Sequence, residues 1–122
     1  MKTIIDAINW DDLEWETVRP GLRRKTYHGQ NVTITYNEAL PGMELFPHSH
    51  VHEQLVYWLS GSSNFTVDGV VYPMKAGSVM AIPPNVQHFG NTTGNEPAVN
   101  IDVFVPIRPE YKASKRKSMD QK

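Results

Sequence analysis

Short segments rich in Val, Ile, Thr, Tyr and Phe recur along the chain and are separated by turn-forming residues. The clearest of these segments are residues 31–37, 54–61, 63–69, 70–74, 77–84 and 97–106. Turn signals such as Pro41-Gly42, Asp68-Gly69 and Pro83-Pro84-Asn85 lie between them. Several short strands must close a barrel or stack two sheets to bury their inner faces. The sequence therefore predicts an all-β domain with mostly antiparallel strands.

The signals at the turns and the ends of the chain predict its organisation. Asp68-Gly69 predicts a tight hairpin, because a type I′ turn needs a positive φ at both central residues. Helix signal is limited to a turn or two near Thr3 to Asn9. We expect an N-terminal segment at 1–14, one domain at 15–111, and a polar, basic tail at 112–122 that is disordered.

Composition excludes several classes of partner and site. The 122 residues carry a formal net charge of −1, which favours small partners over nucleic acid or an anionic membrane surface. There is no cysteine, so a metal site has to use His, carboxylate or amide ligands. No apolar run reaches the roughly 20 residues that span a bilayer. Acidic residues interrupt the start of the chain where a secretory signal is apolar, so we expect a cytoplasmic location.

The histidines of the chain are concentrated in one place. Three of the five, His48, His50 and His52, lie within five residues, just before an apolar segment that predicts a strand. Residues two apart in a strand point to the same side. His48 and His50 can therefore present both rings to one metal ion.

Two more residues are candidates to complete this site. Gln54 can offer a carbonyl oxygen, and His88 follows the Pro-Pro turn at 83–84. His52 and Glu53 compete with Gln54, but a bend before Gln54 would turn them away, so we place both outside the ligand set. The alternative for the whole cluster is a group of histidines that are exposed or satisfied within the core.

The spacing of these residues resembles the two sequence motifs of the cupins. The first match is Gly42-x5-His48-x-His50-x3-Gln54-x6-Gly61, against G-x5-H-x-H-x3-4-E-x6-G, and the second is Gly77-x5-Pro83-x-Asn85-x2-His88, against G-x5-P-x-G-x2-H-x3-N. The resemblance implies a jelly roll of two sheets, the cupin double-stranded β-helix, with one divalent metal ion. Ni, Zn, Fe, Mn and Co all suit three imidazoles and an amide. Because His ligands must be neutral, we expect metal release as the pH falls through about 6.

The match departs from the cupin motifs at three positions. Asn85 replaces a Gly and tolerates the left-handed conformation that the Gly would supply, and Asn91 falls one residue early. Gln54 replaces the usual Glu. A neutral amide leaves the metal's charge uncompensated, which favours an anionic ligand and a Lewis-acid role.

The last apolar segment, residues 97–106, combines strand alternation with polar residues. Alternation puts Asn100, Asp102 and Phe104 on one face. Arg108 follows the Pro106 break and suits bidentate capture of a carboxylate. Taken singly, each has a structural explanation: a solvent-facing Asp, a core Phe and an Arg in a surface ion pair.

A glutamine-containing metal site followed by Asp-x-Phe-x-Pro-x-Arg resembles the KdgF-type cupins of pectin and alginate breakdown, over residues 15–111. This resemblance implies conversion of 4,5-unsaturated uronates to linear keto-uronates. It implies a small anionic sugar substrate and a homodimer. In that reaction Asp102 would move the proton, Arg108 would anchor the acid and Phe104 would shape the pocket.

Two other function classes are compatible with the same residues. One is another metallo-cupin reaction, such as an Fe(II) dioxygenase, a lyase or a cyclase acting on a small acid, and oxygen consumption would identify the first of these. The other is a cupin that binds a small ligand without turnover. The proton-transfer group at Asp102 argues against pure binding, although a shared fold cannot settle function.

Overall fold

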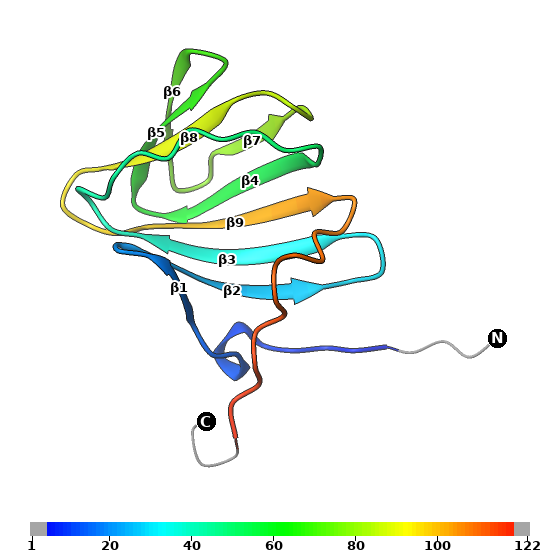
Figure 1. The fold of residues 1–122 in the computed structure, drawn as a ribbon. Coiled ribbons are helices and arrows are strands. Elements are labelled where there is room, and N and C mark those ends of the chain that lie inside the picture. The colour runs from blue at the N-terminus through cyan, green and yellow to red at the C-terminus, as the bar shows by residue number, and fades with distance from the viewer. Residues whose placement is uncertain (1–4, 119–122) are drawn as a thin grey trace.

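Two antiparallel sheets make up the fold in the computed structural model, which describes residues 5–118 (Figure 1). The larger sheet has the strand order β1-β2-β3-β9-β4-β7, and the smaller has β6-β5-β8. The elements are η1 (Trp10–Asp12), β1 (Glu16–Arg19), β2 (Leu22–His28), β3 (Thr33–Ala39), β4 (Glu53–Ser60), β5 (Ser62–Val67), β6 (Val70–Lys75), β7 (Val79–Ile82), β8 (His88–Thr93) and β9 (Ala98–Val105). The predicted all-β jelly-roll architecture is confirmed.

The hairpin between β5 and β6 forms at the predicted turn. Val67 pairs with Val70, and φ is 50° at Asp68 and 78° at Gly69, as a type I′ turn requires. β8 was not predicted, because its sequence, HFGNTT, is polar and contains a glycine. Gly90 is needed there, since a Cβ at that position would lie 2.8 Å from Cε1 of Phe65 on β5.

The interior between the sheets divides into a packed core and a cavity. The core cluster consists of Val56, Trp58, Phe65, Met80 and Ile82. Residues 53–59 of β4 alternate between exposed and buried, so Gln54 shares the inward face of the core residues at the cavity end of the strand. Tyr57 lies on the outer face, 45% exposed, and Trp58 is fully buried. Neither of this pair lines the cavity.

The ends of the chain differ from the sequence-based expectation. Residues 112–118, predicted to be disordered, are held by backbone hydrogen bonds: Ser114 N–H donates to the carbonyl of Thr26 (3.0 Å), and Lys117 N–H donates to that of Asp12 (2.8 Å). Such pairing does not depend on an apolar side-chain pattern, so it cannot be predicted from hydrophobic periodicity.

The short helix also lies elsewhere than predicted. Residues 5–9 form no helix, and the 3₁₀ turn follows at Trp10–Asp12, capped by the side chain of Asn9. Thr3 and Ile4, which belong to the predicted helical turn, lie outside the described residues. Within residues 5–118 there is no helix with the length and apolar character needed to cross a bilayer.

Candidate metal centre

Backbone pairing brings His48 and His88 together from distant parts of the chain. The two residues form an isolated β-bridge, in which each N–H donates to the other's carbonyl at 3.1 and 2.9 Å. Their ring centroids are 4.3 Å apart, and that of His50 is 5.0 Å from that of His88. His48 and His50 lie before β4 in irregular chain, not on the strand that their spacing suggested. Asn85 has a φ of 65°, as expected where the motif has Gly, and its N–H donates to the carbonyl of His50 (2.7 Å).

The three histidines present unprotonated nitrogens to one point. Nδ1 of His48, His50 and His88 faces the backbone carbonyl of Phe46, His52 and Val86, at 2.7, 2.9 and 2.9 Å. A carbonyl only accepts, so each Nδ1 carries the proton and each Nε2 keeps a lone pair. One ring nitrogen from each of the three lies within 4.8 Å of the others.

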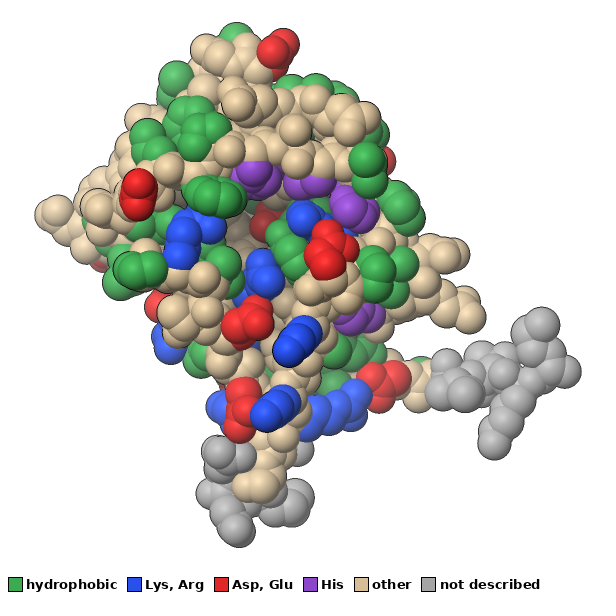
Figure 2. Space-filling view, in the orientation of Figure 1, with side chains coloured by type: hydrophobic (Ala, Val, Ile, Leu, Met, Phe, Trp, Pro, Cys, Tyr) green, Lys and Arg blue, Asp and Glu red, His purple; other side chains and the backbone are tan. Residues whose placement is uncertain are grey.

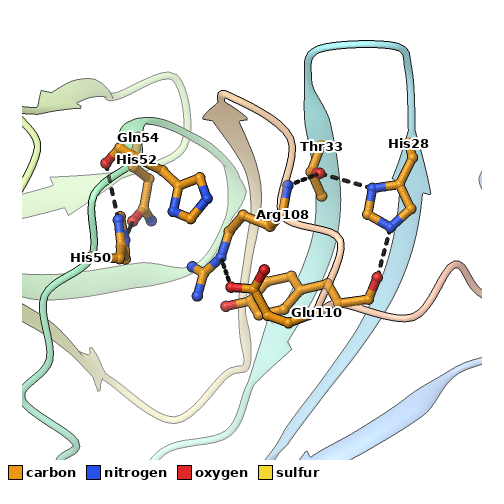
Figure 3. Close-up of polar contacts among 8 residues, drawn as sticks. His28, Thr33, His50, His52, Gln54, Arg108 and Glu110 are labelled. Carbon is orange, nitrogen blue, oxygen red and sulfur yellow. Dashed lines mark hydrogen bonds and ion pairs between the residues drawn. The ribbon is translucent and has the colours of Figure 1, made fainter.

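Two observations at this cluster fit a bound cation. Nε2 of His88 is buried with no hydrogen-bond partner among the described residues. Nε2 of His50 faces Oε1 of Gln54 at 3.0 Å, although both atoms are acceptors in this tautomer (Figure 3). A divalent ion would satisfy all of these lone pairs, and three imidazoles with an amide oxygen are a suitable donor set. The residues present therefore fit a metal ion.

Gln54 is oriented by Asp102. The Gln54 side-chain N–H donates to Oδ1 of Asp102 (3.0 Å), which turns Oε1 toward the histidines. Asn37 Nδ2 donates to Oδ2 of the same carboxylate (3.0 Å). Asp102 thus receives amide donors on both oxygens and fixes the one amide that points at the cluster.

The bend expected before Gln54 occurs at residues 51–52. His52 is 8% exposed, its carbonyl accepts from His50, and its ring centroid lies 5.5 Å from that of His50, but its nitrogens do not belong to the group of three. Glu53 is exposed on the outer face of β4. Both residues lie outside the cluster, as the sequence predicts.

A cavity of about 620 Å³ opens beside the histidines. Figure 2 shows this hollow with histidines along its rim and Lys or Arg side chains on its walls. Asp102, Phe104 and Arg108 all line it, together with His48, Gln54 and His88. Six of the seven predicted site residues therefore reach one cavity, and the seventh, His50, contacts Gln54 from the adjoining loop.

Asp102 lies inside this cavity with an unusual protonation equilibrium. Burial disfavours its charged form and raises its pKa to about 6, against the opposing effect of the hydrogen bonds from Gln54 and Asn37 and of the nearby arginines. A carboxyl group with a pKa near neutrality can both accept and return a proton.

Arg108 is held over the cavity by several contacts. Its guanidinium lies 4.8 Å from the ring centroid of Phe104 and 4.1 Å from that of Tyr111, and Nε pairs with Glu110 at 3.1 Å. The backbone N–H of Arg108 donates to Thr33 Oγ1 (2.8 Å) (Figure 3). Arg108 thus approaches the cavity from a segment that is tied to β3.

His28 completes this attachment of the 108–111 segment. Its Nε2 lies 2.6 Å from the carbonyl of Tyr111, which only accepts, so this nitrogen carries a proton. Its Nδ1 lies 2.8 Å from Thr33 Oγ1. The contacts of Thr33 and His28, shown in Figure 3, therefore join β2 and β3 to the segment that carries Arg108.

Replacing Thr33 by Val should loosen this segment. The change leaves the partly buried N–H of Arg108 without its acceptor, so we expect a loss of about 1–3 kcal/mol in the free energy of unfolding. Urea denaturation of the apoprotein measures it. Thr66→Val on β5 is the matched control, and equal stability of the two variants would contradict the attachment.

Several cavity residues were missed or misplaced from the sequence. Asn37 and Tyr111 line the cavity and were not identified as site residues, although the alternation of residues 31–37 could have placed Asn37 on an inward polar face. Arg24 was not identified either, and its guanidinium lines the cavity 3.7 Å from the ring centroid of Tyr111. Lys25 is also buried, with Nζ donating to the carbonyl of Trp10 (2.9 Å). Of the three consecutive basic residues Arg23, Arg24 and Lys25, Arg23 faces outward and pairs with Glu38.

The histidines of the cluster resist protonation. Burial lowers the pKa of His48 and His50, and lowers that of His88 to about 4. A lowered pKa means that the neutral, metal-binding form persists to lower pH. The expected pH of metal release therefore moves below the value of about 6 that ordinary histidines suggest.

Metal affinity should accordingly be nearly constant from pH 8 to about 6.5 and fall most steeply between about 6 and 4. Competition against a colorimetric chelator of known proton affinity, at half-unit pH steps, measures it. A tenfold loss of affinity between pH 8 and 7 would show that the histidines titrate normally.

The chain is similar to a known family and to several known proteins. The cupin domain family matches residues 36–104. The pectin degradation protein KdgF of Dickeya dadantii is 29% identical over 104 residues, which cover 83% of this chain and 93% of that protein. The dimethylsulfoniopropionate lyase DddW of Ruegeria pomeroyi is 29% identical over 87 residues, 71% of this chain, and the match spans only 55% of that protein.

A solved structure extends the similarity to three dimensions. KdgF from Halomonas sp. superposes with a TM-score of 0.72 and 25% sequence identity, over 80% of this chain and 89% of that one. The cupin family match covers more than half of the chain, including both segments that supply the histidines. The two-sheet fold and these matches establish that the chain belongs to the cupin family, within which it is similar to KdgF.

Proposed function

We propose that this protein is a metal-dependent enzyme that converts 4,5-unsaturated uronate monosaccharides to linear keto-uronates. The observation that carries the proposal is the convergence, in one cavity, of the histidine cluster, a carboxyl group of raised pKa and an arginine on an aromatic platform. The similarity to two KdgF proteins supports the same activity.

The proposed reaction is an isomerisation without a redox step. The C1 hydroxyl loses its proton, C1 becomes a carbonyl carbon as its bond to the ring oxygen breaks, and C4 gains a proton. The ring oxygen becomes the C5 keto oxygen. A metal ion at His48, His50, Gln54 and His88 would supply Lewis-acid polarisation of substrate oxygens.

The side chains around the cavity would perform the remaining steps. Arg108 presents a planar guanidinium for the substrate carboxylate, and Phe104 provides an apolar surface beside it. Asp102, in its ionised form, takes the proton from the C1 hydroxyl and returns one to C4. Its pKa of about 6 leaves it mostly ionised at neutral pH while keeping its conjugate acid strong enough to donate.

The ultraviolet absorbance of unsaturated galacturonate tests this function directly, because ring opening removes the C4–C5 double bond. Metal-loaded protein should accelerate the loss well above the spontaneous rate in the absence of oxygen, and a chelator should abolish the acceleration. Failure of metal-loaded protein to accelerate the loss would contradict the proposed reaction.

The match to DddW favours a second candidate, an elimination reaction on a small acid. The same carboxyl group at Asp102 could remove a proton next to a carboxylate held by Arg108. Release of dimethyl sulfide from dimethylsulfoniopropionate would support this candidate. The homodimer implied by the resemblance to KdgF-type cupins stays a prediction.

A further inference from the structure

Arg19, at the end of β1, reaches the cavity because the strand is irregular there. The register of β1 against β2 shifts between Thr17 and Arg19. As a result, the consecutive residues Val18 and Arg19 both line the cavity, which a regular strand would not allow. A bulge that turns a side chain into a cavity is a common device beside functional sites.

The charge of Arg19 is left without a carboxylate partner. Arg24 pairs with Glu16 and Arg108 with Glu110, whereas Arg19 forms no ion pair within residues 5–118. Its Nε is buried and has no hydrogen-bond partner there. Among the described residues that line the cavity, Asp102 is the only acid.

Stacking on Phe46 leaves the guanidinium free to bind. The Arg19 guanidinium carbon lies 4.6 Å from the ring centroid of Phe46, which is itself 54% exposed. An arginine that stacks on an aromatic face keeps its N–H edge available for an anion. The contact with Phe46 therefore orients the Arg19 guanidinium without occupying its N–H donors.

Strand register separates Arg19 from Arg108 across the cavity. Arg19 pairs with Leu22, Leu22 pairs with Ala39, and Ala39 pairs with Ala98. Arg108 follows Phe104, which pairs with Thr33 at the other end of β3. Thr33 and Ala39 are six residues apart on β3, about 20 Å along the strand. The two side chains thus enter the same cavity from opposite ends of the sheet, and two long arginine side chains that reach inward shorten this backbone separation to about the length of a hexose acid.

From these observations we infer that Arg19 forms a second anion-binding position, so that the cavity accepts a hexose-sized acid with an anionic group at each end. The inference rests on the proposed function in placing the first carboxylate at Arg108. It adds a charged contact that a sugar with one carboxylate leaves unused. Dicarboxylate sugar acids should therefore bind more tightly than monocarboxylates of the same size.

Calorimetric titration with galactarate, galacturonate and galactose tests the inference, because these sugars have two, one and no carboxylates and none of them can undergo the proposed reaction. Wild-type protein should bind galactarate most tightly, with and without metal. Arg19→Gln should weaken galactarate about tenfold to a hundredfold and galacturonate far less. Arg19→Lys, which keeps the charge but loses the planar fork, should give an intermediate affinity.

The control is Arg23→Gln, which removes the same charge from the outward-facing arginine paired with Glu38. It should leave all three affinities unchanged. The inference is overturned if wild-type protein does not prefer galactarate, if Arg19→Gln binds it as wild type does, or if Arg23→Gln weakens it equally.

These outcomes are separable from those of the proposed function. Preference for galactarate that depends on Arg19, in a protein that does not consume unsaturated galacturonate, would support the anion position and refute the reaction. Turnover of unsaturated galacturonate, with no effect of Arg19 on galactarate binding, would support the reaction and refute the anion position.

Discussion

Asp102→Ala should lower turnover of unsaturated galacturonate by about 10²–10⁴-fold even at a saturating concentration of metal, which offsets the weaker binding expected once Gln54 loses the partner that orients it. The variant loses the group whose burial raises its pKa to about 6, and so loses the proposed route for the proton. The three histidines keep their own backbone partners, which do not involve Asp102. Initial rates of absorbance loss, with metal measured on the same samples, give the turnover and the metal content.

A second substitution separates proton transfer from the positioning of Gln54. Asp102→Asn keeps the shape but cannot accept from both Gln54 and Asn37 without turning one of these amides. It should be as inactive as the alanine variant and bind metal more weakly if the Gln54 amide turns. Asp68→Asn, in the β5–β6 turn, is the control for loss of a carboxylate and should behave as wild type. Turnover retained by both Asp102 variants would remove this residue from the mechanism.

His88→Ala should abolish stable metal binding, with a loss of affinity of more than about 100-fold, and turnover with it. The estimate follows from the 10–100-fold losses found when only a partner of a metal ligand is removed. His88 is the best-placed member of the cluster, because its Nδ1 is held by Val86 and its Nε2 is buried without another partner among the described residues. Equilibrium dialysis with Ni²⁺ or Zn²⁺ measures the affinity.

His52→Gln is the control for this experiment, since His52 belongs to the same histidine-rich segment but its ring lies outside the group of three. Its metal affinity should stay within about tenfold of the wild type. Equal losses in the two variants would mean that His52 is a ligand or that the whole loop is disturbed. Wild-type affinity in His88→Ala would refute the histidine site.

The local patterns in the sequence were sufficient for most of the fold. Asp68-Gly69 predicted its hairpin correctly, because only residues that tolerate a positive φ can form that turn. Alternation correctly placed Asn100, Asp102 and Phe104 on one face of β9. β8 was not predicted from the sequence. Its formation depends on pairing with β5 and on the space that Gly90 leaves for Phe65, and neither is a local property.

The candidate ligands were identified from spacing, but their convergence is a tertiary property. His48 and His88 meet because their backbones pair across 40 positions of sequence, and the strand expected around His48 and His50 does not form. Gln54 acquires its orientation from Asp102, a residue on another strand. The spacing identifies these residues as candidate ligands, but it does not predict which atom of the Gln54 amide faces the histidines.

The sequence by itself determined most of the strands from β3 onward, the hairpin turn and the residues able to bind a metal, because these depend on local conformation and on side-chain chemistry. The tertiary structure decided which way the arginines point. Arg24 lines the cavity whereas its neighbour Arg23 pairs with Glu38 on the outside, and Arg19 turns inward through a shift in strand register. Pairing between strands sets that register, and a shift of one residue sends a side chain to the opposite face, so no single segment encodes it.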